Sequence, residues 1–185
     1  MPSVVIVIGE GSYRALNAMT ERLADACENL GAKVLRIDAD FVGARGSDER
    51  VIHDVEAFSP DLFIGMNLTG ITRLTGRWIP EVLRNPCLSW MVDHPAYYLS
   101  GGSPLYQLRN LPNYHVACVD PAHLKFLERF YPKDRLHFLP HASVDPVANP
   151  IGYEDRIPSA VMTAGLGNVQ ALAEDAWNRD TPAGP

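Results

Sequence analysis

Short apolar runs alternate with segments of helical spacing along most of the chain. Residues 4–8 (VVIVI) form a β-branched run closed by Gly9, which predicts a strand buried on both faces. Between Ser12 and Gly31 the apolar residues recur at helical spacing, so this segment predicts a helix capped by Ser12 and stopped at Gly31. The apolar positions of that helix are Leu16, Met19, Leu23, Cys27 and Leu30.

The same alternation continues through the chain and predicts its fold class. Further strands are expected at residues 34–37, 62–66, 87–92, 115–119 and 136–139. Helices are expected at residues 51–58 and after the capping Asp120, where Leu124, Leu127 and Phe130 are apolar. Residues 101–112 are rich in Gly and Pro and predict a long loop. Together these elements indicate an α/β, Rossmann-like doubly wound domain, with a mostly parallel sheet of about six strands and helices on both faces.

The pattern of residue types in the sequence changes after Val144. Pro146, Pro150, Gly152 and Pro158 mark a linker-like passage. Beyond it, residues 160–167 and a helical stretch to Trp177 are typical of the opening strand, turn and helix of another α/β unit. We therefore expect a Rossmann-like N-terminal domain at residues 1–148 and, at residues 149–185, a linker and the incomplete start of a second domain.

Composition and charge narrow the class of protein. Apolar residues make up 46% of the chain and charged residues 21%, which indicates a globular fold and argues against disorder. The net charge is −6, and no stretch gathers Lys and Arg into a basic patch, so we expect no nucleic-acid partner. The run at residues 4–8 is far shorter than the roughly 20 residues that span a bilayer, so we expect no transmembrane segment.

The cysteines and the first residues predict a cellular compartment. Cys27, Cys87 and Cys118 are odd in number and far apart, which argues against a disulfide framework and a structural zinc site. No basic residue precedes the first apolar run and no small-residue cleavage site follows it. These patterns favour a reducing, cytoplasmic location.

Candidate site residues follow the ends of the predicted strands. In an open parallel sheet ligands bind outside the carboxyl ends of the strands, so these residues should meet at one edge. The set is Glu10, Gly11 and Ser12, Asp38, Asn67 with Thr69 and Gly70, Asp93 and His94, Asp120, and His141. Asp, Asn and Gly also favour turns and caps, so Asp120 fits a helix cap and Asp38 fits either a ligand or a solvated turn.

The turn after the first strand has one feature of a dinucleotide site. Gly9-x-Gly11 resembles the start of a phosphate-binding turn, with Asp38 where a ribose-binding acid would lie. Arg14 occupies the third glycine position, and Glu10 would place a carboxylate beside the phosphates. The glycines are explained equally well by a tight connection between strand and helix.

The densest cluster of polar and aromatic residues is at 90–98 (WMVDHPAYY). Asp93 beside His94 suits a base that takes a proton from a hydroxyl nucleophile, and Tyr97 and Tyr98 offer rings to a sugar. The alternative is that Asp93 and His94 organise a turn before Pro95 while the tyrosines pack beneath it. No metal site is expected, since His137 and His141 are separated by Pro140 and share no helical face.

Several segments resemble a known family of enzymes. They are Gly9-x-Gly11 after the first strand, residues 60–64 (PDLFI), 86–95 (PCLSWMVDHP), 118–120 (CVD) and 139–145 (LPHASVD). Their order resembles the N-terminal half of GT-B glycosyltransferases, and more narrowly the bacterial group related to spore-maturation CgeB-type proteins, over about residues 3–145. There, a W-x-x-D-x-P segment and a later L-P-H/G-x-x-x-D segment recur.

The resemblance implies an activity and roles for individual residues. In that family the N-terminal domain binds the acceptor, the second domain holds the nucleotide-sugar donor, and transfer takes place between them. Asp93 or His94 would be the catalytic base. The acceptor side would be lined by Glu10, Gly11, Ser12, Asn67, Tyr97, Tyr98, Asp120 and His141.

The expected function follows from the resemblance and from the length of the chain. Residues 153–185 are too few to form a donor domain, so we expect the acceptor-binding half of a glycosyltransferase that itself binds no cofactor. Its expected partners are a glycan or protein acceptor and a donor-binding domain or subunit, and self-association would cover apolar surface. The alternative is a non-catalytic Rossmann-like module that binds a small ligand or a protein.

Overall fold

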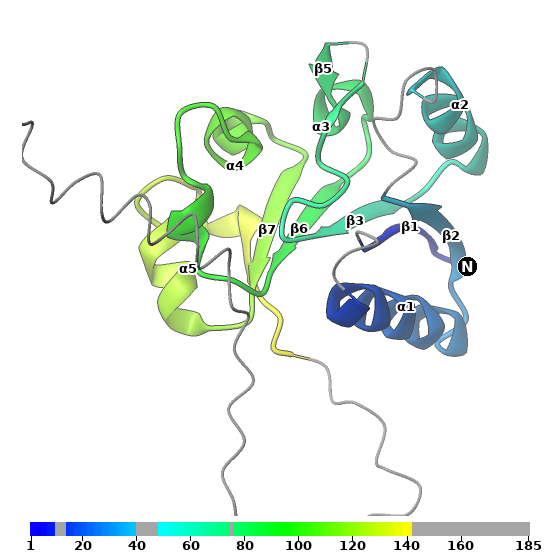
Figure 1. Cartoon of the computed structure of the whole chain (residues 1–185), viewed down its shortest axis with the longest axis horizontal. Helices are drawn as coiled ribbons and strands as arrows, with labels where there is room; N and C mark the ends of the chain where they lie inside the picture. Colours follow the sequence, from blue (N-terminus) through cyan, green and yellow to red (C-terminus); the bar gives the residue numbers. More distant parts are fainter. Residues whose placement is uncertain (10–13, 40–47, 75, 142–185) are drawn as a thin grey trace, which may run out of the picture. The chain divides into compact units, whose positions relative to one another are not determined.

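A parallel sheet forms the centre of the domain. The computed structural model describes residues 1–9, 14–39, 48–74 and 76–141 (Figure 1). Within them, six strands lie in the order β2-β1-β3-β6-β7-β8, and every neighbouring pair is parallel. The strands are β1 (Ser3–Ile8), β2 (Lys33–Asp38), β3 (Leu62–Met66), β6 (Cys87–Met91), β7 (Tyr114–Cys118) and β8 (Leu136–Phe138). The predicted α/β, Rossmann-like fold is confirmed.

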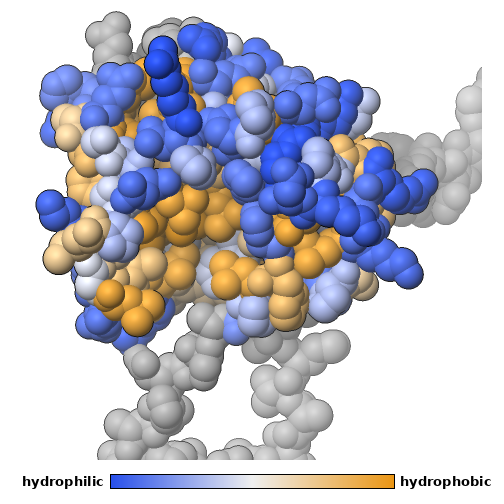
Figure 2. All heavy atoms as spheres, turned by 180° about the vertical axis from the view of Figure 1, so that it is seen from behind, coloured by the Kyte–Doolittle hydropathy of each residue, from blue (hydrophilic) through white to orange (hydrophobic). Residues whose placement is uncertain are grey.

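Helices cover both faces of the sheet but do so unequally. The helices are α1 (Arg14–Asn29), α2 (Asp48–Phe58), α3 (Ile79–Val82), α4 (Pro104–Gln107) and α5 (Pro121–Leu127). Leu16, Met19 and Leu23 of α1 pack on one face, against Ile64, Met66 and Trp90 among others. The other four helices pack on the opposite face (Figure 1). Seen from behind the view of Figure 1, a group of apolar residues is exposed on the surface (Figure 2).

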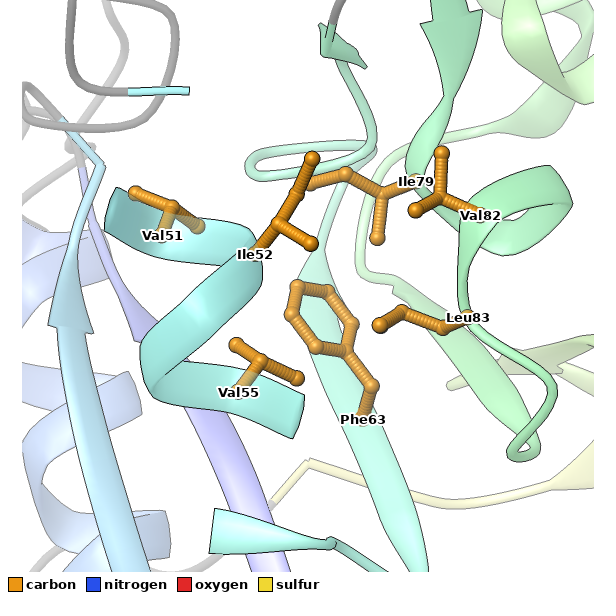
Figure 3. Close-up of a pocket in the computed structure, with 7 residues that line it drawn as sticks. All are labelled: Val51, Ile52, Val55, Phe63, Ile79, Val82 and Leu83. Atoms are coloured by element: carbon orange, nitrogen blue, oxygen red, sulfur yellow. The ribbon is translucent and has the colours of Figure 1, made fainter. Parts of the chain in front are cut away.

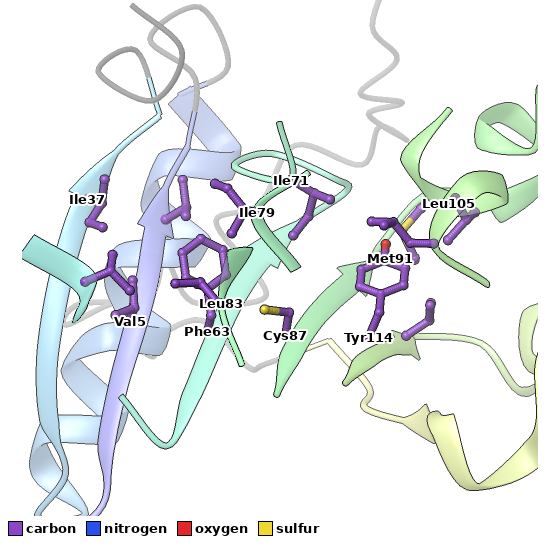
Figure 4. Packing of buried hydrophobic residues seen from close by; sticks show 14 of the residues in the cluster. Val5, Ile37, Phe63, Ile71, Ile79, Leu83, Cys87, Met91, Leu105 and Tyr114 are labelled. Atoms are coloured by element: carbon purple, nitrogen blue, oxygen red, sulfur yellow. The ribbon is translucent and has the colours of Figure 1, made fainter. Parts of the chain in front are cut away.

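The larger core lies under the four helices. Alternate residues of each strand point to this face, among them Val5, Phe63, Met91 and Tyr114, and all four are fully buried (Figure 4). One polar pair lies inside this core, where the hydroxyls of Ser89 and Tyr114 are 2.8 Å apart. Because each hydroxyl satisfies the other, the pair avoids the cost of burying an unpaired polar group.

Residues 101–112 differ from the predicted loop. They contain α4 and a 3₁₀ helix, η2 (Leu108–Asn110), and both Leu105 and Leu108 are buried. Ser103 caps α4 by accepting a hydrogen bond from the Tyr106 N–H at 3.3 Å. The loop prediction was wrong because the Gly and Pro residues flank this short apolar segment instead of interrupting it.

Three further details differ from the predicted elements. Leu30 is 88% exposed, because α1 ends at Asn29 and the chain turns through Gly31 at a φ of 87°. Phe130 lies beyond the end of α5 at Leu127. A short antiparallel hairpin, β4 (Arg73–Leu74) with β5 (Arg77–Trp78), was not predicted at all.

The last described residues are tied back to the sheet. The Trp90 indole N–H donates to the Leu139 carbonyl oxygen at 3.0 Å, and the Leu139 N–H donates to the Cys118 carbonyl oxygen at 3.0 Å. The chain divides into two units between Ser143 and Val144, and all described residues belong to the first. The predicted linker and second-domain segment, residues 149–185, lie outside the described residues.

None of the helices that the structure describes is both long enough and apolar enough to cross a lipid bilayer.

Candidate functional site

Three predicted site residues meet at the carboxyl edge of the sheet. Asn67 directly follows β3 and donates its side-chain N–H to Asp93 Oδ2 at 2.8 Å. Its side-chain oxygen accepts from the backbone N–H groups of Val92 at 2.8 Å and Asp93 at 3.2 Å. The Tyr98 hydroxyl donates to the same Asp93 Oδ2 at 2.9 Å. Asp93 therefore has one carboxylate oxygen held by two donors, and the described residues offer Oδ1 no hydrogen bond.

The backbone that presents Asn67 is in an uncommon conformation. Asn67 and Leu68 have φ values of 48° and 69°, and Gly70 has a φ of 80°. The first two are non-glycine residues in the left-handed region, which costs about 1–3 kcal/mol each. A Cβ on Gly70 would lie 2.5 Å from Val7 Cγ2, so the loop after β3 packs directly against β1. The fold maintains a strained loop at the place where the site was predicted.

A cavity lies beside this loop. Its volume is about 340 Å³, and it is lined by Ala39, Asn67, Leu68, Thr69, Gly70, Ile71 and Thr72. β2 and β3 lie on opposite sides of β1, so the cavity is at the topological switch point, where ligands bind in open α/β sheets. The strand-end rule identified Asn67, Thr69 and Gly70. It missed Ala39, Leu68 and Ile71, because their side chains are not typical of a ligand site, and it missed Thr72, because this residue lies farther from the end of the strand.

His94 takes part in the local turn. Its Nδ1 accepts a hydrogen bond from the Ala96 N–H at 3.1 Å and caps the 3₁₀ helix η1 (Pro95–Tyr98). In the neutral ring the proton is then on Nε2, so neither nitrogen is free to accept a proton from a substrate without breaking the cap. The ring also lies 4.5 Å from that of His123, centroid to centroid. This geometry favours Asp93 over His94 as the candidate base.

The two tyrosines after His94 have different environments. Tyr98 contacts Asp93, as described above, and is half-buried. Tyr97 is 81% exposed, and its ring centroid lies 6.3 Å from that of His94. The idea that both tyrosines pack beneath the turn does not hold for Tyr97, which presents its ring to solvent beside the site.

The remaining predicted residues lie apart from this network. Asp120 caps α5, with Oδ1 accepting from the Ala122 N–H at 2.7 Å, which agrees with the capping interpretation. His141 follows β8 and is exposed, and no hydrogen bond or ion pair joins it to Asn67 or Asp93 in the described part of the chain. Asp38 lines a different cavity of about 370 Å³, between β2 and α2. Glu10, Gly11 and Ser12 lie outside the described residues.

Gly9 has a structural reason to be glycine. A Cβ at this position would lie 1.9 Å from Asn17 Oδ1 and 2.7 Å from the Asn17 backbone nitrogen. The Gly9 N–H donates to the buried Thr20 hydroxyl at 3.1 Å, which fixes the end of β1 against α1. Close packing of strand and helix therefore accounts for this glycine without a phosphate ligand.

A third cavity, between α2, β3 and α3, is a gap in the packing. Its lining residues are Val51, Ile52, Val55, Phe63, Ile79, Val82 and Leu83 (Figure 3). Its volume of about 10 Å³ is close to the minimum for one water molecule, and its lining is apolar. We therefore assign no ligand to it.

The described residues at the strand ends offer neither a cluster of three or more metal ligands nor a reactive thiol. Among the described residues there is no group of three or more His, Cys, Asp and Glu side chains that could hold a metal ion. All three cysteines are free, and burial raises the pKa of both Cys87 and Cys118 to about 12. Protonated, buried thiols are poor nucleophiles.

Comparisons of the chain with protein-family models, with curated proteins and with solved structures find no match. The function must therefore be argued from the site itself.

Proposed function

We propose that the described domain is the acceptor-binding half of a glycosyltransferase that transfers a sugar from a nucleotide-sugar donor to a hydroxyl acceptor. The observation that carries this proposal is the Asp93 carboxylate, held by Asn67 and Tyr98 at the edge of a strand-end cavity. Asn67 belongs both to the hydrogen-bond network and to the cavity lining, so a ligand in the cavity lies next to the network. The segment around Asp93 is also one of those on which the family resemblance rests.

In this proposal Asp93 is the general base. Its Oδ1 accepts the proton of the acceptor hydroxyl as that oxygen forms a bond to the anomeric carbon of the donor sugar. The bond between the anomeric carbon and the donor phosphate breaks, and the nucleotide diphosphate leaves with the bonding electron pair. Asn67 and Tyr98 act as positioning residues, because they fix the carboxylate and touch it through Oδ2 alone.

The lining of the cavity suits an acceptor better than a nucleotide. The described residues of the lining offer an amide and two hydroxyls, from Asn67, Thr69 and Thr72, and include no Lys or Arg to neutralise phosphate. Hydroxyl and amide groups are suitable partners for sugar hydroxyls. The exposed ring of Tyr97 adds an aromatic surface near Asp93, on which the apolar face of a sugar can stack. The donor would bind to another domain or subunit, as the resemblance implies.

A non-catalytic binding module is the second candidate. It is favoured because the described residues that line the cavity are uncharged, and such a lining can hold a small polar ligand without catalysing a reaction. Both candidates predict binding at this cavity, and they differ in whether Asp93 is needed for turnover.

The first experiment is a binding screen on the full chain. Saccharide acceptors should raise the melting temperature and nucleotide sugars should not, because a ligand stabilises a protein only through preferential binding to its folded state. Thr69→Val, which removes a hydroxyl from the cavity, should weaken saccharide binding. Binding of nucleotides without saccharides would contradict the acceptor role.

The second experiment separates the two candidates. With a donor-binding partner supplied, Asp93→Asn should lose sugar transfer by about 100-fold or more while it still binds the acceptor, because general bases contribute about 10²–10⁴-fold. Asp120→Asn is the matched control, since Asn also caps helices well and Asp120 lies outside the network. Wild-type transfer by Asp93→Asn would remove the base role and leave the binding module.

A further inference from the structure

Two histidines meet on neighbouring strands, away from the candidate site. His115 is on β7 and His137 is on β8, and His115 Nδ1 lies 3.1 Å from His137 Nε2. The ring centroids are 5.3 Å apart, and the ring planes are inclined by 32°. In the β7–β8 register His137 lies opposite Ala117, so His115 is its diagonal neighbour on the same face of the sheet.

The distance between the two nitrogens matches the separation of two ligands on one metal ion. Imidazole nitrogens bind first-row divalent metals at about 2.0–2.1 Å. With angles at the metal between about 90° and 109°, two such nitrogens lie about 2.8–3.4 Å apart, from that bond length. The observed 3.1 Å is inside this range. The same contact is a hydrogen bond between the two rings, so a bound metal ion would replace the shared proton and both lone pairs would turn toward the ion. His137 is exposed, which leaves room for its ring to turn.

The cation nearest in sequence to His137 is engaged elsewhere. Arg135 directly precedes β8, and its Nη1 donates to the Leu111 carbonyl oxygen at 2.5 Å.

We propose that His115 and His137 form a bidentate binding site for a divalent late first-row transition ion, such as Cu²⁺, Ni²⁺ or Zn²⁺. Imidazole is a preferred ligand of these ions, whereas Mg²⁺ and Ca²⁺ take oxygen ligands. The described residues supply two ligands, and water fills the other positions because the pair opens to solvent. The sequence pattern missed this site, since it compared His137 with His141 along the chain and not with His115 across the sheet.

The test is a titration of the full chain with Cu²⁺, the ion that such sites bind most tightly. Isothermal titration should show one equivalent bound, and electron paramagnetic resonance should show coupling to two imidazole nitrogens. Loss of a residue that merely orients a metal ligand costs about 10–100-fold in affinity, so loss of a ligand should cost at least as much. His115→Gln and His137→Gln should each weaken binding by about tenfold or more, and Mg²⁺ should not compete.

Two other histidines provide control variants. His53→Gln and His141→Gln remove exposed histidines outside the pair and should leave Cu²⁺ binding unchanged. His137 is exposed, so His137→Gln tests the site even if His115→Gln fails to fold. Absence of a bound equivalent, or unchanged affinity in His137→Gln, would overturn the proposal. These readouts do not depend on sugar transfer, so they hold whether or not the proposed function is correct.

Discussion

The side chain of Asn67 donates one hydrogen bond to Asp93 and accepts another from it. The Asn67 side-chain N–H donates to the Asp93 carboxylate at 2.8 Å, and its side-chain oxygen accepts from the Asp93 backbone N–H at 3.2 Å. One side chain thus connects the end of β3 to the end of β6 and sets the direction of the carboxylate. An aspartate at position 67 would lose the donor and place two carboxylates together, so asparagine is the side chain that fits this link.

Replacing Asn67 should separate the energy of its hydrogen bonds from that of its backbone. Asn67→Gly removes three side-chain hydrogen bonds and should lower the free energy of unfolding by about 1–3 kcal/mol. Asn67→Ala should cost about 1 kcal/mol more, because alanine is disfavoured at a φ of 48°. Urea unfolding measures both. Equal stability of the two variants would show that the left-handed backbone carries no cost.

Gly70 should be far less replaceable than Gly76. Gly70→Ala combines a φ of 80° with a Cβ placed 2.5 Å from Val7 Cγ2, and we expect a loss of about 2–4 kcal/mol. Gly76→Ala has a similar φ of 84° but nothing within 4 Å of the new Cβ, so about 1 kcal/mol should be lost. Thermal or urea unfolding of the pair checks this. A similar loss of unfolding free energy in both variants would mean that β1 shifts away from the new Cβ without loss of stability.

The three cysteines should react in a fixed order. Cys27 is partly exposed, and partial burial and the nearby Glu28 raise its pKa, whereas the deeper burial of Cys87 and Cys118 raises their pKa values to about 12. At pH 8 a thiol reagent such as DTNB should therefore modify one thiol per native chain, and all three in denaturant. Cys27→Ser should abolish the native reaction. Rapid modification of two or more thiols in the native chain would contradict the buried positions of Cys87 and Cys118.

His115 should make stability depend on pH in one direction. Its folded-state pKa is lowered below the ordinary value of about 6.5, so the unfolded chain binds the proton more readily. The contribution of His115 is complete above about pH 6.5 and is lost as pH falls from there to the folded-state pKa. Urea unfolding between pH 5 and 8 should show a steeper decline for the wild type than for His115→Gln. Parallel curves would show that the folded state leaves this group unperturbed.

The sheet was predictable because its central strands are buried on both faces. Continuous apolar runs such as residues 4–8 and 62–66 have few alternative structures, and their order with the intervening helices implies parallel pairing. The strand-end rule then placed Asn67 and Asp93 at one edge, where they are hydrogen-bonded. The sequence also indicated Asp120 as a cap, since an acid before Pro121 suits the start of a helix.

The rest depended on contacts that no local pattern encodes. For His94 the sequence left open a base or a turn residue before Pro95, and the hydrogen bond of its Nδ1 to the Ala96 N–H agrees with the turn. The β4–β5 hairpin has two residues in each strand, too few for alternation to be seen. The contact of His115 with His137 depends on the register between β7 and β8, which is a property of the assembled sheet.

The hydrogen bond from Trp90 to Leu139 has a mechanical consequence. β8 is a three-residue strand at the edge of the sheet, and so short a strand is easily separated from its neighbour. The Trp90 indole extends from β6 past β7 and binds Leu139, the residue that follows β8. A pull on the chain beyond Leu139 would therefore load β6 as well as β7. β6 is the strand that leads into Asp93, so tension at this end of the domain would be transmitted to the candidate site.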